Sequence, residues 1–131
     1  MISNYTYNAA NTGITQSYPV LLLEGKGVGG DNFDAIKAQL RSYLDDSGFD
    51  RCWAIGARGQ KMKFWRYIRD RSEDKMRPLR NTGERVVEAS TDSTNEYILD
   101  ITDFNPPDAA KAYVPILDYI RDHPDAPAGP L

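Results

Sequence analysis

The chain is poor in the residues that most often build redox and metal chemistry. Its 131 residues include one cysteine, Cys52, and one histidine, His123. A single cysteine excludes an internal disulfide and a cysteine-rich metal cluster, and it favours a reducing, intracellular compartment. No apolar run approaches the roughly 20 residues of a membrane-spanning helix, and the polar N-terminus lacks the pattern of a signal peptide. We therefore expect an intracellular protein, cytoplasmic or nuclear, with no membrane association.

Acidic residues are missing from the start of the chain. The first 23 residues contain no Asp and no Glu, although the whole chain has 19 acidic residues against 16 basic ones. The basic residues are concentrated in residues 56–86, which carry ten Lys or Arg and four acidic residues, a local charge of +6. Such a segment inside an acidic chain is typical of a polyanion-binding surface, although a solvated hairpin and loop has the same composition.

The hydrophobic pattern predicts a mixed central sheet. Nearly continuous apolar runs at 18–24 and 52–57 are typical of interior strands covered on both faces. Residues 61–67 alternate and are expected to pair back on the second run as a hairpin. A charged loop is predicted over 69–83. Weaker strand signals occur around Tyr5 and Tyr7 and over residues 84–89 and 96–101.

Two helices are expected beside these strands. Apolar residues recur at helical spacing from Phe33 to Leu44, with Asp31 as the expected N-cap and Asp34 in the first turn. A last helix follows Pro107, and Pro115 is expected to kink or split it. The fold class is therefore α/β or α+β, with a mixed central sheet flanked by helices.

One domain accounts for the predicted elements. It covers residues 1–123, and the proline-containing tail over 124–131 is expected to be frayed and flexible. No internal repeat is visible. The pattern leaves a homodimer open.

Two charged residues occur where the apolar pattern predicts the end of a buried strand. Glu24 and Lys26 are two residues apart, so a strand would place both on one face. A carboxylate binds a hard cation such as Mg²⁺ through oxygen, and a neighbouring lysine can stabilise charge on a phosphate. On the following helix, Gln39 and Tyr43 are four residues apart and share a face. A simple ion pair, a solvated Gln39 and a core Tyr43 would give the same sequence.

Together these motifs resemble the PD-(D/E)XK, or restriction-endonuclease-like, nuclease superfamily. The similarity consists of Glu24-x-Lys26, Gln39-x-x-x-Tyr43, an interior strand and the hairpin "GQKMKFWRY", over roughly residues 18–67. It is similar to the Q-x-x-x-Y branch found in nuclease domains of type I restriction subunits and RecB-like enzymes. The resemblance implies a restriction-endonuclease-like core with Glu24 as a metal ligand and Lys26 as the catalytic lysine. Gln39 and Tyr43 would orient the site or contact the nucleic-acid backbone.

The chain departs from that superfamily at the first acid. The superfamily carries an Asp on the strand before E-x-K, whereas no acid precedes Glu24 here. One carboxylate is a poor Mg²⁺ site because affinity depends on the number of charged ligands. Asp31, Asp34 or a partner subunit are the other sources of an acid.

We therefore expect a degenerate nuclease-like domain without a cofactor. It would act as a non-hydrolytic binding or regulatory module for nucleic acid or for a protein partner. Two alternatives stay open: an active Mg²⁺-dependent endonuclease completed by another acid, and a small-molecule enzyme that reuses the cleft.

The predicted hairpin supplies the candidate nucleic-acid contacts. Its basic and aromatic side chains can neutralise and stack a nucleic-acid strand, or form an ordinary exposed hairpin face. The candidate residues are Arg58, Lys61, Lys63, Trp65 and Arg66.

A glycine motif competes for the same region. Gly25-x-Gly27-x-x-Gly30 matches the dinucleotide-binding fingerprint, follows a predicted strand and precedes a predicted helix. The helical periodicity begins only at Phe33, and Asp31 and Asp34 would repel a pyrophosphate at the helix start. We expect these glycines to form a loop at the rim of a pocket.

Overall fold

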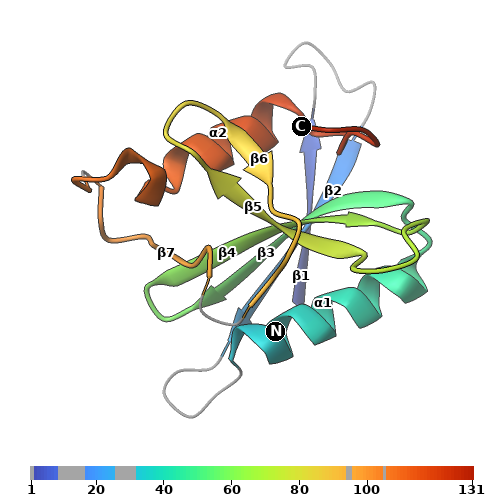
Figure 1. The fold of residues 1–131 in the computed structure, drawn as a ribbon. Coiled ribbons are helices and arrows are strands. Elements are labelled where there is room, and N and C mark those ends of the chain that lie inside the picture. The colour runs from blue at the N-terminus through green and yellow to red at the C-terminus, as the bar shows by residue number, and fades with distance from the viewer. Residues whose placement is uncertain (1, 9–16, 26–31, 94–95, 105) are drawn as a thin grey trace.

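The structure is a computed structural model that describes residues 2–8, 17–25, 32–93, 96–104 and 106–131. Within these ranges, one seven-stranded sheet is flanked by two α-helices, α1 (Phe33–Ser47) and α2 (Val114–Asp122), and a 3₁₀ helix, η1 (Ala109–Lys111), precedes α2 (Figure 1). The strands are β1 (Ile2–Asn8), β2 (Ser17–Gly25), β3 (Arg51–Arg58), β4 (Lys61–Ile68), β5 (Met76–Asn81), β6 (Val86–Glu88) and β7 (Leu99–Asp100).

The sheet is mixed, as the sequence predicts. Its order is β1-β2-β3-β4-β5-β6, and β7 pairs with β4 on the same side as β5. The neighbouring strands β2 and β3 are parallel and are joined through α1, whereas all other described pairs are antiparallel. The prediction of an α+β fold with a mixed central sheet flanked by helices is confirmed.

Helix α1 covers one face of the sheet through its apolar side. A glycine of β3, Gly56, lies where the helix approaches most closely. A Cβ atom at Gly56 would lie 2.8 Å from Cγ2 of Ile36 and 2.9 Å from the Trp65 ring, so only glycine fits without movement of its neighbours. The buried residues of this side are Phe33, Ile36, Leu40, Leu44, Cys52, Ala54, Trp65, Tyr67 and Met76.

Both ends of α1 have defined caps. The N-cap is Asn32, whose side chain accepts a hydrogen bond from the backbone N–H three residues later at 2.9 Å. The predicted N-cap, Asp31, is therefore wrong by one position and lies outside the described residues. At the other end Gly48 has a left-handed φ of 85°. The guanidinium group of Arg69 donates to three carbonyl groups there at 2.9–3.1 Å, which satisfies acceptors that the helix itself leaves free.

Helix α2 covers the opposite face of the sheet (Figure 1). Pro115 lies in its first turn, where a missing N–H costs nothing. The predicted last helix is thus split, as expected, into η1 and α2. The buried residues of this side are Trp53, Phe64, Leu79, Val86, Leu99, Ile116, Ile120 and Ala126.

The structure differs from the sequence prediction in two segments. The charged loop predicted over residues 69–83 contains β5, whose apolar residues are buried between its arginines. The tail at 124–131, predicted to be frayed, packs against the sheet: Ala126 is 2% exposed, and Arg51 Nε donates to its carbonyl at 2.7 Å. Arg66 Nη1 donates to two further tail carbonyls at 2.6 and 2.8 Å. Two arginines of the sheet, the buried Arg66 and the partly exposed Arg51, thus fix a segment whose own composition favours disorder.

None of the helices in the described ranges is both long and apolar enough to cross a bilayer.

Candidate functional site

The predicted charged strand end lies at an edge where several elements meet. Glu24 is the second-last residue of β2 and pairs in register with Ala57, while Gly25 pairs with Arg58. Across the hairpin, Arg58 pairs with Lys61. Because β2 and β3 are parallel, their carboxyl ends share one edge of the sheet, which is where open α/β sheets bind ligands. We call Glu24, Gly25, Arg58 and Lys61 the strand-end edge.

The strand-end edge is accessible on its basic side. Lys61 is exposed and Arg58 is half-buried. Lys26 and the glycine-rich loop residues Gly27 and Gly30 lie outside the described residues, as does Asp31.

The two motif residues of the helix lie on one flank of α1. Gln39 is exposed, and Tyr43 is 38% exposed, so Tyr43 is not the core aromatic that the sequence allowed. Lys37 precedes Gln39 by two residues, which is about 200° around a helix. Gln39 and Tyr43 therefore lie on the flank opposite to Lys37 and Arg41. Helix α1 also contacts β2, the strand that contains Glu24.

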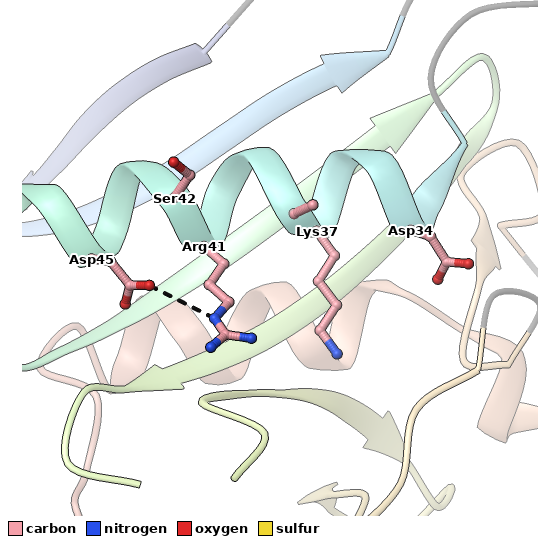
Figure 2. A pocket seen from close by; sticks show the side chains of 6 residues that line it. Asp34, Lys37, Arg41, Ser42 and Asp45 are labelled. Carbon is pink, nitrogen blue, oxygen red and sulfur yellow. Dashed lines mark ion pairs between the residues drawn. The ribbon is translucent and has the colours of Figure 1, made fainter. Parts of the chain in front are cut away.

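The other flank of α1 borders an open pocket of about 450 Å³. Figure 2 shows Lys37 and Arg41 extending from the same side of the helix, with Ser42 directed away from them. Arg41 Nε lies 3.7 Å from Oδ2 of Asp45, an ion pair between adjacent turns. The lining holds two acidic and two basic side chains, so its charges balance, and we assign no ligand to it. The lining residues are Asp34, Lys37, Ala38, Arg41, Ser42 and Asp45.

A buried group of charges lies beside this pocket. The Asp92 carboxylate accepts hydrogen bonds from Lys63 Nζ, from Lys37 Nζ at 2.9 Å and from Trp65 Nε1 at 3.2 Å. Lys63 is 1% exposed and also donates to the Ser93 carbonyl at 2.9 Å. Burial alone would raise the pKa of Asp92, but the hydrogen bonds from Lys63, Lys37 and Trp65 outweigh it and hold that pKa below its usual value.

This arrangement corrects the predicted nucleic-acid contacts. Lys63, Trp65 and Arg66 are at most 2% exposed, so they form no surface that a nucleic acid can reach in this structure. The physical reason is that both faces of β4 are covered, with Trp65 in the α1 core and Arg66 bound by the C-terminal tail. Of the five candidates, Arg58 and Lys61 alone remain at least partly exposed.

Part of this burial had a signal in the sequence. Lys63 alternates with Trp65 and Tyr67, and two large aromatic residues on one strand face indicate a covered face rather than a solvated one. Asp92 had no comparable signal, because it lies 29 residues from Lys63 in an irregular segment.

A second polar contact links β4 to the end of α1. Tyr67 Oη donates to Asp45 Oδ1 at 2.6 Å, and Lys75 Nζ lies 3.6 Å from the same oxygen. Burial, followed by the hydrogen bond to Asp45, raises the pKa of Tyr67 to about 12. The hydrogen bond from Tyr67 is also the main reason that the pKa of Asp45 is lowered. Tyr67 is thus a neutral hydrogen-bond donor near pH 7 and joins the helix to the sheet.

In the described part of the chain, no group of three or more His, Cys, Asp or Glu side chains is placed to hold a metal ion. Cys52 is buried in the α1 core, and its Sγ lies 3.1 Å from the Trp53 carbonyl oxygen. His123 stacks on Tyr119 with ring centroids 4.1 Å apart.

Comparisons with known proteins add no family to this description. No family model, no curated protein and no solved structure matches the chain. The relation to the PD-(D/E)XK superfamily therefore stays a hypothesis that rests on the motifs.

Proposed function

We propose that the chain is a non-hydrolytic binding module that contacts the backbone of a nucleic acid at the strand-end edge. The observation that carries the proposal is the strand register, in which Gly25, Arg58 and Lys61 are consecutive neighbours across β2, β3 and β4. Two cations next to a glycine allow a phosphodiester backbone to approach closely, since glycine presents no side chain.

The order of the elements further supports the proposal. The Glu24 strand is followed by the helix with Gln39 and Tyr43, and then by a parallel strand. The same order is what the nuclease resemblance implies. Because the strand that precedes β2, β1, carries no acidic residue, we propose that the domain retains the binding role of such a site and not its hydrolysis.

Salt-dependent binding of a single-stranded oligonucleotide tests the proposed contact. We expect the affinity of the wild type to fall steeply with salt, because binding releases counterions. Lys61→Glu should weaken binding several-fold and reduce the salt slope by about one. The matched control is Arg121→Glu, which makes the same charge change on the exposed end of α2 and should leave the affinity unchanged. Equal losses of affinity in both variants, or an affinity that does not change with salt concentration, would contradict the proposal and favour a protein partner or a small molecule.

Calorimetric titration with Mg²⁺ and Mn²⁺ tests the absence of hydrolysis separately. We expect only heats of dilution for the wild type and for Glu24→Ala, because a single carboxylate binds Mg²⁺ poorly. Micromolar binding that is lost in Glu24→Ala, together with metal-dependent nicking of DNA or RNA, would instead support an active nuclease.

A further inference from the structure

A second pocket lies at the other end of β4, between β5, β6 and the C-terminal residues. Its volume is about 420 Å³, within the range of about 300–1,000 Å³ that is typical of small-molecule sites. Among the described side chains, four arginines and one glutamate line it, together with apolar and backbone groups. We call Arg66, Arg71, Arg77, Arg85 and Glu88 the arginine pocket.

Glu88 is shared by two of the arginines. Its carboxylate accepts from Arg66 Nε at 2.8 Å and from Arg66 Nη2 at 3.1 Å, a bidentate pair. The same carboxylate accepts from Arg71 Nη2 at 2.5 Å. The remaining nitrogen of Arg66, Nη1, donates to carbonyls of Pro127 and Gly129, so each side-chain nitrogen of Arg66 has a partner.

The single carboxylate of Glu88 leaves part of the positive charge of the arginine pocket uncompensated. Arg77 is the direct register partner of Arg66, and like charges opposite each other on neighbouring strands repel. Arg71 Nη1 and Arg77 Nε are both buried and have no hydrogen-bond partner. Buried polar groups nearly always have partners in folded proteins, and among the described side chains four guanidinium groups face one carboxylate here. The side chains that line the pocket therefore carry an excess of positive charge.

We propose that the arginine pocket binds a phosphate group, either as inorganic phosphate or as the phosphate of a small phosphomonoester. The guanidinium fork matches the oxygens of phosphate and donates to them bidentately. Arg71 and Arg77 bring positive charge to the wall of the pocket, and Arg85 adds an exposed charge to its lining. This site is separate from the strand-end edge and does not depend on the function proposed there.

Calorimetric titration with inorganic phosphate and with phenyl phosphate tests this site. We expect the wild type to bind at least one of the two probes at millimolar concentration or below. Tighter binding of phenyl phosphate would identify a phosphomonoester as the ligand class. Equal or tighter binding of inorganic phosphate would identify the free ion as the ligand. Arg77→Gln should weaken binding by about tenfold, the effect of losing one charged hydrogen bond.

The same strand offers a matched control. Arg80 is an exposed arginine of β5 that is not part of the arginine pocket, so Arg80→Gln should bind both probes like the wild type. If Arg77→Gln does not fold, Arg85→Gln replaces it, because Arg85 lines the pocket and is exposed. Lys61→Glu should also leave phosphate binding intact. Absence of binding to the folded wild type, or equal losses in Arg77→Gln and Arg80→Gln, would overturn the proposal.

Discussion

Asp92 is the residue that balances the buried charges on the α1 side of the sheet. Its carboxylate is the described counter-charge of Lys63, which is 1% exposed and pairs with it directly. Asp92→Asn keeps the shape of the side chain and removes its charge, so Lys63 would be left buried without compensation. We expect the free energy of unfolding at pH 7 to fall by about 3–5 kcal/mol, the usual cost of breaking a buried ion pair. Urea denaturation measures it.

The pH dependence of Asp92→Asn separates this charge effect from a packing defect. The pKa of Asp92 is lowered in the folded protein, whereas an unfolded Asp titrates near about 3.9. The ionised carboxylate therefore stabilises the fold above that pH, and its contribution is lost as the pH falls through the folded-state pKa. The wild type and Asp92→Asn should thus converge in acid, whereas a constant difference would contradict the charge argument. As a second check, adding Lys63→Met to Asp92→Asn should restore stability, because it removes the uncompensated charge.

At the scale of elements, hydrophobic periodicity predicts the helices and strands whose buried residues recur at a fixed spacing. Helix α1 and strands β2, β3 and β4 were predicted from the apolar pattern alone. The described side chains of α1, β3 and β4 show why, because each of these elements buries a whole face or stripe. Strand β5 was missed because Arg77 and Arg80 interrupt its short apolar pattern, and its burial depends on distant partners. Asn32, not Asp31, became the N-cap, and both residue types are equally suited to that role.

The contact between α1 and the sheet predicts the effect of a single added methyl group. Gly56→Ala would place Cβ 2.8 Å from Ile36 Cγ2 and 2.9 Å from Trp65, so the helix or the ring must shift. We expect a loss of about 1–3 kcal/mol in the free energy of unfolding, as is usual for an overpacked core. Gly129→Ala is the control, since its Cβ would meet nothing within 4 Å. Equal stability of Gly56→Ala and the wild type would show that α1 does not lie this close to β3.

At the scale of the whole molecule, the candidate site was predictable only in the part that is built from elements consecutive in the sequence. Glu24 and the hairpin end with Arg58 and Lys61 share one edge because a strand, a helix and a parallel strand follow each other in the sequence. The burial of Lys63 and Arg66 depends on Asp92 and on the C-terminal tail, which are distant in sequence. Only the complete fold brings these segments together, so the local pattern indicates a covered face around Lys63 but not the partners that bury Lys63 and Arg66.

The tail over residues 124–131 tests this long-range dependence directly. Its removal deletes the two carbonyls that accept from Arg66 Nη1 and takes Ala126 out of the α2 core. The buried guanidinium group of Arg66 would keep Glu88 but lose both acceptors of Nη1, at a cost of about 1–3 kcal/mol, and the lost packing adds to it. We therefore expect the protein ending at His123 to unfold at lower urea than the chain with its tail. Arg66→Gln should destabilise the chain with the tail more than the chain without it, because the two changes remove the same bonds. Equal stability with and without residues 124–131 would mean that the tail is flexible, as its composition alone predicts.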